Sequence, residues 1–447
     1  MPSPIAAKQE PELLARIDQA RARTDALFRL LPPNSFYDRP IPERHRLIFY
    51  LGHLEAFDWN LLAPVLGLAS KNPAFDKLFA FGIDPVGSDL PSDTPEDWPT
   101  IAKVERYNLE VREALDESLG ATNALDTCSP LADGTLLNVA IEHRLMHAET
   151  LAYLLHNMPV ERKTPQAAPA PDRRPEPRPI RVRIPAGVAT LGQKREAQTF
   201  GWDNEFKTKE MFVPSFSIDA FPVTNAEYLK FVQAGGYEQA SYWGPQDWEW
   251  KRQQRLEHPH FWERGSGLPA SDPDARWEYR TMFGTIPLPR SWPVFVSHAE
   301  ACAFCRWAGK KLPTEAQWHR AAYGAPDGTE RMYPWGEDGP DSARGNFHHQ
   351  RWTAAPVDAH PAGASAFAVQ DLLGNGWEWT STVFAPLPGF EPHPFYPGYS
   401  ANFFDGKHYV LKGGSQRTDA CMLRRSYRNW FQPNYPYIYA TFRCVEE

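Results

Sequence analysis

Apolar residues recur at alternating steps of three and four along four stretches of the chain between residues 10 and 158. The first stretch begins at Glu10, the second begins near Pro42, the third opens at Pro99, and the fourth begins near Leu136. This spacing places one apolar stripe along each helix, and four such stripes can bury one another in a bundle. We therefore expect residues 10–158 to form a four-helix bundle.

The pattern changes after the fourth stretch. Residues 159–180 are dense in proline, alanine and arginine, a composition that cannot bury a core and that favours an extended linker. From residue 181 to residue 447, short strand-like runs alternate with glycine, proline and tryptophan. The clearest helix is predicted in SHAEACAFCRWAG, with Ser297 as its N-cap. We expect an α+β domain over residues 181–447.

Composition adds limits on the class of protein. A chain of 447 residues is too long for one compact core, and a net charge of −8 argues against non-specific binding of nucleic acid. No apolar run approaches the roughly 20 residues of a membrane span, and the N-terminus lacks the layout of a secretory signal. Five scattered cysteines do not indicate a disulfide framework. We expect a cytoplasmic protein that acts on small molecules and has no nucleic-acid or membrane partner.

Three histidines on the predicted helices are candidates for a metal site. His143 and His147 stand four residues apart in IEHRLMHAETL, so a helix would place both on one face, and His53 lies in the middle of the second predicted helix. An imidazole in a core is costly unless it is bonded, and bundle cores build metal sites from facing helices. Two interpretations stay open at this point: hydrogen-bonded core histidines, or ligands of one zinc, copper, iron or nickel ion.

A second candidate motif, the CxxC formed by Cys302 and Cys305, falls inside the predicted amphipathic helix. It has neither the βαβ context of a redox motif nor a second pair for a zinc site. We expect both cysteines to be packing residues. Neither a glycine-rich phosphate loop nor a GxSxG motif occurs in the sequence.

Motifs spread over the second half resemble formylglycine-generating enzymes (sulfatase-modifying factors), whose fold is a variant of the C-type lectin fold. These motifs are IPAGVATLG, FPVTNAEYLKFV, WPVFVSHAEACAFCRWAGKKLPTEAQWHRAA, YPWGE, LLGNGWEWTST, YVLKGGSQ and the final FRC. The N-terminal bundle resembles a DinB-type domain. A DinB bundle followed by this fold is the arrangement of the ergothioneine-biosynthetic sulfoxide synthases (EgtB) and their relatives. The chain resembles that family along almost its whole length.

This resemblance implies a metal and a reaction. In the family, one histidine of an LxH motif and two of an HxxxH motif bind iron, and these match His53 in LGH and His143 and His147 in HRLMH. They are the three histidines that the helical pattern had selected. The resemblance implies Fe(2+) as the cofactor. It also implies a dioxygen-dependent reaction that joins sulfur to C2 of the imidazole ring of hercynine and oxidises the sulfur to a sulfoxide.

The resemblance also implies residues that bind hercynine, which is Nα-trimethylhistidine. An Asn-Trp pair contacts its trimethylammonium and carboxylate groups in these enzymes, and the matching residues are Asn429 and Trp430 in YRNWFQP. A tryptophan face is the best partner for a quaternary ammonium, so the chemistry agrees. The nearest candidates for the proton-donating tyrosine of the family are Tyr396 and Tyr399 in FYPGYS.

The sequence departs from family members that use γ-glutamylcysteine. Those members resemble RNWDYPxxR and carry arginines in the loop after the second helix. Here Phe431 and Tyr435 replace the Asp and the Arg, and the loop offers Asp89 and Asp93, which would repel a dicarboxylate. Unless an arginine such as Arg424 or Arg425 supplies a clamp, we expect a smaller donor. This donor is free cysteine, or a selenosugar whose face could stack on the two aromatic rings.

Alternatives to a sulfoxide synthase stay open. A selenoneine synthase would join hercynine to the selenosugar on the same scaffold. A ligand-binding module without catalysis would need no histidine triad, although lectin-like folds often only bind ligands. A third alternative is a zinc-dependent thiol transferase of the DinB type. Formylglycine generation is not expected, because those enzymes use a copper-binding cysteine pair after GGS, where this chain has Cys421 alone.

Overall fold

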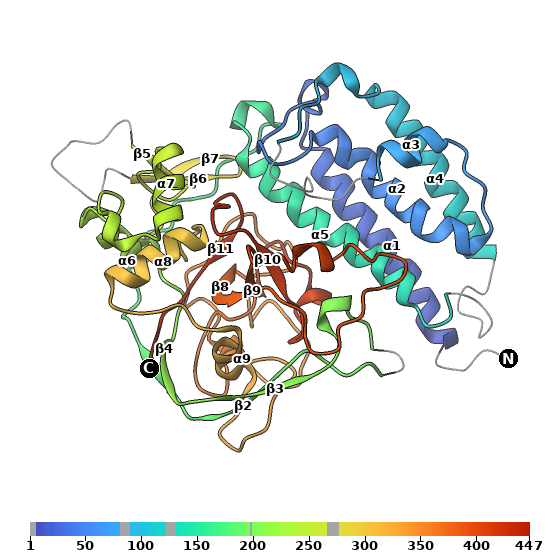
Figure 1. Ribbon diagram of the computed structural model, residues 1–447. Helices are drawn as coiled ribbons and strands as arrows, with labels where there is room; N and C mark the ends of the chain where they lie inside the picture. Colours follow the sequence, from blue (N-terminus) through green and yellow to red (C-terminus); the bar gives the residue numbers. More distant parts are fainter. Residues whose placement is uncertain (1–5, 81–89, 122–130, 197–198, 266–276) are drawn as a thin grey trace. The chain divides into compact units, whose positions relative to one another are not determined.

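The computed structural model describes residues 6–80, 90–121, 131–196, 199–265 and 277–447. The chain forms two compact units, which Figure 1 shows in colours that follow the sequence. The first unit comprises Met1–Gln166 with Glu196–Phe200, and the second comprises Ala167–Arg195 with Gly201–Glu447. Each unit is described by itself below.

The first unit is a helical bundle, which confirms the predicted fold. Its four long helices are α1 (Ala6–Phe28), α2 (Leu47–Leu66), α4 (Ile101–Ala121) and α5 (Thr135–Asn157), and a short helix α3 (Pro73–Leu78) lies between α2 and α4 in the sequence. Helix α5 packs on α1 and on α2, and α2 also packs on α4. The face of α2 that these contacts bury carries the candidate ligand His53.

Helix α2 begins later than the predicted start near Pro42. Its first two amides, those of Leu47 and Ile48, donate to the carbonyls of Asp38 and Phe36. The upstream segment therefore caps the helix with its own backbone, which satisfies amides that would otherwise lack partners. Such a backbone cap leaves no pattern of side chains, so the periodicity alone placed the start about one turn too early.

The second unit is α+β, with small sheets and short helices. One sheet has the order β1 (Arg181–Ile184), β4 (Phe216–Asp219), β12 (Val445–Glu446), and another has the order β10 (Asn429–Phe431), β9 (Tyr409–Gly414), β8 (Gly376–Val383), β11 (Ala440–Thr441). Strands β2 (Gly187–Leu191) and β3 (Lys209–Val213) form a pair, and β5 (Trp262–Arg264), β6 (Trp277–Thr281) and β7 (Gly284–Pro287) form a third sheet. The helices are α6 (Asn225–Gln233), α7 (Pro245–Gln253), α8 (His298–Trp307) and α9 (Glu315–Tyr323). No helix in the described part of the chain is long and apolar enough to cross a membrane.

The predicted N-cap of α8 is confirmed. The Ser297 hydroxyl accepts from the amide of Glu300, and the Glu300 carboxylate accepts from the amide of Ser297 at 2.8 Å, which together make a capping box. Cys305 of this helix is buried, with its Sγ 3.5 Å from that of Cys444. Burial raises the pKa of the Cys302 thiol to about 12. Both CxxC thiols therefore stay protonated, as packing residues do.

Strand β10 holds the candidate residues Asn429 and Trp430 at the edge of the four-stranded sheet. It pairs antiparallel with β9, so that Asn429 lies opposite Leu411 and Trp430 opposite Val410. Strand β9 ends in the double glycine of YVLKGGSQ. Gly413 has a φ of 93°, and a Cβ there would lie 2.6 Å from the carbonyl oxygen of Leu372. Only glycine fits this close approach of two backbones.

Candidate metal centre

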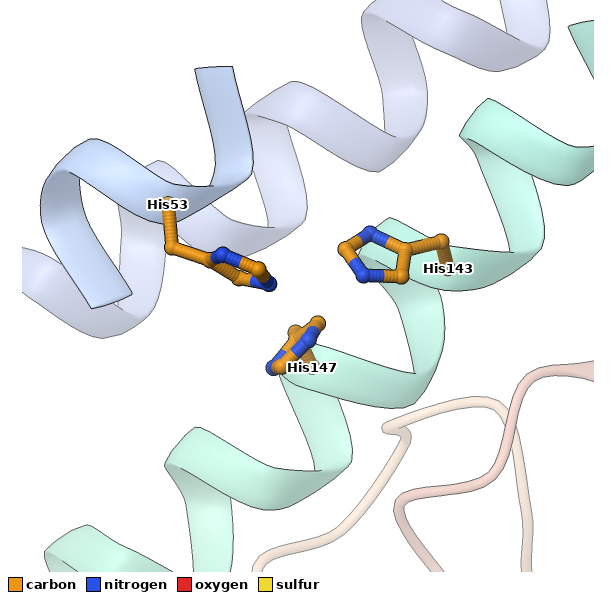
Figure 2. A group of neighbouring side chains, drawn as sticks. All are labelled: His53, His143 and His147. Atoms are coloured by element: carbon orange, nitrogen blue, oxygen red, sulfur yellow. The ribbon is translucent and has the colours of Figure 1, made fainter. Parts of the chain in front are cut away.

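Three histidine side chains converge inside the bundle. Figure 2 shows His53 of α2 facing His143 and His147 of α5. One ligand nitrogen from each ring lies within 4.8 Å of the others, and all three residues are buried. In the described part of the chain, this is the one group of three such side chains close enough to hold a metal ion. The structure thus brings together the three histidines that the sequence singled out.

The hydrogen bonds of these rings distinguish the two open interpretations. His53 Nδ1 lies 2.7 Å from the carbonyl oxygen of Phe79, so this nitrogen carries the proton and donates it. His53 Nε2 and both ring nitrogens of His147 are buried without a hydrogen-bond partner among the described residues. Core histidines normally satisfy such atoms, because an unpaired buried polar group is costly. Neutral nitrogens with free lone pairs fit a metal ion instead.

The surroundings keep the rings neutral and oriented. Burial lowers the pKa of His53 to about 4 and lowers the pKa of His143 and His147 well below the usual value. A metal binds the neutral form of imidazole, so it need not displace a proton. Phe57 stacks on His143 with ring centroids 3.4 Å apart, and Phe49 stacks on His53 at 4.8 Å. These rings restrict the orientation of the imidazoles.

The carbonyl that orients His53 depends on a glycine. A Cβ on Gly52 would lie 2.6 Å from three carbons of the Phe79 ring, so Phe79 packs directly against the backbone of α2. This close approach accompanies the hydrogen bond from His53 to the Phe79 carbonyl. Bonds of this kind fix the tautomer of ligating histidines. The glycine of the LGH motif is therefore needed so that Phe79 can pack against α2, a requirement that the sequence pattern did not reveal.

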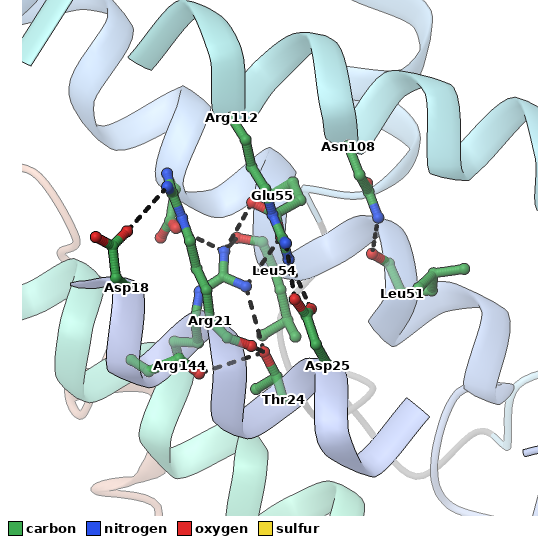
Figure 3. Close-up of polar contacts among 12 residues, drawn as sticks. Asp18, Arg21, Thr24, Asp25, Leu51, Leu54, Glu55, Asn108, Arg112 and Arg144 are labelled. Atoms are coloured by element: carbon green, nitrogen blue, oxygen red, sulfur yellow. Dashed lines mark hydrogen bonds and ion pairs between the residues drawn. The ribbon is translucent and has the colours of Figure 1, made fainter. Parts of the chain in front are cut away.

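A network of ion pairs joins the helices that carry the histidines to their neighbours (Figure 3). Arg144, next to His143, donates to both oxygens of Glu55 at 2.9 Å and to Asp58 at 2.6 Å. Arg112 of α4 also binds Glu55 and makes a two-pronged contact with Asp25 of α1. Burial alone would raise the pKa of Glu55, but the two arginines lower it to about 2. The network therefore links all four long helices around the site.

The apolar periodicity did not predict this network, although charged residues on the same helix faces indicated it. Glu55 and Asp58 lie within two turns of His53 on α2, and Arg144 is the neighbour of His143 on α5. Charged side chains on otherwise apolar helix faces are rarely buried unless they are paired. Opposite charges on two core stripes therefore indicated a buried pair.

In the second unit, Trp430 belongs to an aromatic cluster. It is half-buried, stacks on Phe384 with centroids 4.3 Å apart, and contacts Tyr399 at 5.4 Å and Phe403 at 5.5 Å. The cluster thus brings the candidate hercynine residue together with a candidate catalytic tyrosine. Tyr396 lies one ring further away, 5.7 Å from Tyr399.

The aromatic residues predicted to replace the donor clamp contact each other. Phe431 and Tyr435 stack with centroids 5.2 Å apart and an interplanar angle of 15°. Phe431 is half-buried and Tyr435 is buried. One face of each ring is therefore already covered, which leaves less aromatic surface for a sugar than two independent rings would offer. Neither ring can pair with a carboxylate.

The expectation that Asp93 would repel an acidic donor is wrong. Its carboxylate accepts hydrogen bonds from Arg39, from Arg46 Nε at 2.9 Å and from Trp98 Nε1 at 2.8 Å. Two guanidinium groups outweigh one carboxylate, so this part of the loop presents no excess negative charge. Asp89 lies outside the described residues.

The arginines near the C-terminal motif are also engaged. Arg424 makes a two-pronged contact with the buried carboxylate of Glu205. Arg425 is half-buried and lies 3.5 Å from Glu330. Arg425 is therefore the less tightly held of the two, and it remains the candidate for contact with a substrate carboxylate.

Comparisons with known proteins agree with this architecture. The sulfatase-modifying factor enzyme 1-like domain matches residues 166–447, and the DinB superfamily matches residues 16–151. The hercynine oxygenase of Mycolicibacterium smegmatis is 36% identical over 73% of this chain and 74% of that relative. The chain belongs to the hercynine oxygenase family.

Two further relatives show the breadth of the similarity. Ergothioneine biosynthesis protein 1 of Neurospora crassa is 28% identical over 94% of this chain and 56% of that protein. The formylglycine-generating enzyme of Bos taurus is 31% identical over 55% of this chain and 68% of that enzyme. The resemblance of the sequence to both families is thereby confirmed, as is the order of its two folds.

The triad predicts the behaviour of three variants. Each of His53→Ala, His143→Ala and His147→Ala should bind iron(II) at least about tenfold more weakly, because each removes one of three ligands. Metal content after anaerobic reconstitution measures this, with helix circular dichroism to show that the fold persists. His156→Ala, which changes another buried histidine of α5, is the matched control and should keep its metal. Full metal content in all three triad variants would contradict the assignment.

The ion-pair network predicts a large effect on stability. Arg144→Met removes the guanidinium and leaves Asp58 and part of Glu55 buried with uncompensated charge. Losses of about 3–5 kcal/mol in the free energy of unfolding are typical of such changes. Arg162→Met, which breaks a partly exposed pair with Asp38, should cost less than about 1 kcal/mol. Urea unfolding of both variants compares them, and equal losses would refute the role given to the buried network.

Proposed function

We propose that this chain catalyses an iron(II)- and dioxygen-dependent reaction of ergothioneine biosynthesis. The reaction joins the sulfur of a thiol donor to C2 of the imidazole ring of hercynine and yields a sulfoxide. The observation that carries this proposal is the buried histidine triad, whose neutral nitrogens lack protein partners at His53 Nε2 and at His147. Relatives named hercynine oxygenase and ergothioneine biosynthesis protein 1 support the choice of substrate and pathway.

In this proposal, His53, His143 and His147 hold the iron. When bound, iron(II) supplies the redox chemistry with dioxygen that oxidative carbon–sulfur bond formation requires. The protein contributes orientation: the Phe79 carbonyl holds the proton on Nδ1 of His53, and the remaining nitrogen keeps its lone pair for the metal. Phe57, stacked on His143, and the rest of the buried core keep bulk water away from the rings.

Hercynine binding is assigned to Asn429 and Trp430. The indole ring would contact the trimethylammonium group through cation–π attraction, and the Asn429 side chain would contact the carboxylate. Stacking on Phe384 restrains the indole before any substrate arrives. Tyr399 contacts Trp430 directly, so its hydroxyl is the better placed proton donor, and Tyr396 is the second candidate.

The donor is proposed to be cysteine rather than γ-glutamylcysteine. Phe431 and Tyr435 cannot pair with the two carboxylates and the ammonium of γ-glutamylcysteine, and Arg424 is committed to Glu205. A second candidate function is selenoneine synthase, in which a selenosugar is the donor, because an uncharged sugar needs no charged partner at Phe431 and Tyr435. Arg425 is assigned to contact with a substrate carboxylate.

Two functions from other classes are the alternatives to this proposal. A ligand-binding module would have no use for buried neutral histidines that lack partners. A zinc-dependent thiol transferase would use the same triad, since imidazole also suits zinc. Metal analysis combined with an oxygen electrode separates these cases, because only the proposed reaction consumes dioxygen when both substrates are present.

The role of Trp430 predicts selectivity for a quaternary ammonium. Hercynine should bind the intact enzyme more tightly than histidine does, and Trp430→Leu should reduce this difference by roughly 0.5–2 kcal/mol. Calorimetric titration of both ligands measures it. Trp335→Leu is the matched control, because Trp335 is also half-buried and stacks on Tyr333. Equal affinity of the intact enzyme for hercynine and histidine would exclude this role.

The engaged arginines predict donor preference. Cysteine or a selenosugar should be used at least tenfold more efficiently than γ-glutamylcysteine, a difference of about 1.4 kcal/mol in the transition state. Competition between the three donors at equal concentration, with mass spectrometry of the products, measures the preference. A clear preference for γ-glutamylcysteine would mean that Arg425 or another arginine supplies a clamp.

A further inference from the structure

The segment Arg424–Arg428, which leads directly into Asn429 and Trp430, is anchored by charged groups at every residue. Glu205 accepts from the Arg424 guanidinium and from the Ser426 hydroxyl at 2.7 Å. Lys412 Nζ donates to the carbonyl of Arg425 at 2.9 Å and to that of Tyr427 at 2.5 Å. Glu315 accepts from the Arg428 guanidinium at 2.8 Å. All three anchoring side chains are buried. Contacts with buried charged groups thereby restrain an irregular segment.

Glu205 has the largest share in this anchoring. It is fully buried, and both carboxylate oxygens are saturated by Arg424 Nε at 2.8 Å, Arg424 Nη2 at 2.5 Å, the Ser426 hydroxyl at 2.7 Å and the amide of Trp202 at 2.9 Å. A buried ion pair offsets its desolvation cost only when the remaining hydrogen bonds are also made, as they are here. Such complete pairing fixes the geometry of both partners.

The short 3-10 helix η4 (Asp203–Glu205) and the preceding Trp202 extend this anchoring to Tyr399 and Ser400. Asp203 accepts a hydrogen bond from the Ser400 hydroxyl at 2.6 Å, and Trp202 stacks on Tyr399 with centroids 3.9 Å apart. Tyr399 in turn contacts Trp430. One short stretch of chain therefore holds both segments that contribute to the aromatic cluster.

We propose that Glu205 is a positioning residue for hercynine binding. It acts through Arg424 and Ser426 to hold Asn429 and Trp430 in the arrangement that binds the substrate. These two side chains therefore lose little conformational freedom when hercynine binds. Sites are most selective when their contact residues are restrained by a second layer of hydrogen bonds. This inference rests on the proposed function, because it takes Asn429 and Trp430 as the residues that contact hercynine.

The test compares two buried carboxylates in the full-length, metal-loaded protein. Glu205→Gln keeps the shape of the side chain but leaves one oxygen in place of two, so Arg424 loses its two-pronged partner. Glu300→Gln is the control, since Glu300 is equally buried but bonds Ser297 and Tyr237. Glu205→Gln should weaken hercynine binding about tenfold, roughly 1.4 kcal/mol, with unchanged metal content. Glu300→Gln should bind hercynine within about twofold of the parent protein.

Ser426→Ala, which removes a single hydrogen bond from Glu205, is the milder variant if Glu205→Gln does not fold. It should weaken hercynine binding about threefold, roughly 0.6 kcal/mol. Affinity equal to that of the parent protein in both variants would overturn the proposal. Equal weakening in Glu205→Gln and Glu300→Gln would also overturn it, because a general loss of stability would then explain the effect.

Hydrogen exchange without substrate provides an independent measurement. In Glu205→Gln, faster exchange should be confined to the amides of residues 202–205, 399–400 and 424–431. Faster exchange throughout the second unit, or none at all, would overturn the positioning role. If the parent protein does not bind hercynine, the proposed function fails, and the exchange pattern alone decides whether Glu205 positions this segment.

Discussion

The structure of the first unit depends on the pairing of the polar and charged side chains that are buried in the core of its helical bundle. Three neutral imidazoles and a network of charged side chains lie between α2 and α5, and each would be costly there without partners. Arg144 binds both oxygens of Glu55 and one oxygen of Asp58, which ties α5 to α2. Because the histidines project from these same two helices, the ion pairs determine whether their nitrogens can share one ion. The stability of this core and the arrangement of the candidate metal ligands therefore depend on the same two helices.

The second unit solves a similar problem without long helices. Its candidate substrate residues lie on a short edge strand and on irregular segments, which elsewhere are often mobile. Buried charges replace regular secondary structure as the source of rigidity, with Glu205, Glu315 and Lys412 each bonding the stretch before Asn429. In both units, ion pairs that would contribute little at the surface hold the candidate site residues in place, because burial removes the competition from water.

Periodicity was sufficient to predict what depends on neighbours along the chain. The four helices, the Ser297 cap and the shared face of His143 and His147 all follow from spacing within one or two turns. The contacts that it missed join distant positions. Asp93 meets Arg46, 47 residues earlier, and His53 meets a carbonyl 26 residues later. No pattern of apolar residues encodes such contacts, so the expectation that Asp93 would repel an acidic donor could not be checked before the fold was known.

The donor preference proposed for this chain would then rest on ion pairs within the protein. Asp93 itself would not repel a dicarboxylate donor, since its carboxylate is paired with Arg39 and Arg46. Within the second unit, the proposed selectivity would come from an arginine that already has a partner, since Arg424 is paired with Glu205. A carboxylate of the donor would have to displace an internal one from a buried two-pronged contact, which costs more than pairing with a free guanidinium. A small zwitterion or an uncharged sugar requires no such exchange, so internal pairing of arginines can exclude one class of donor without any repulsive group.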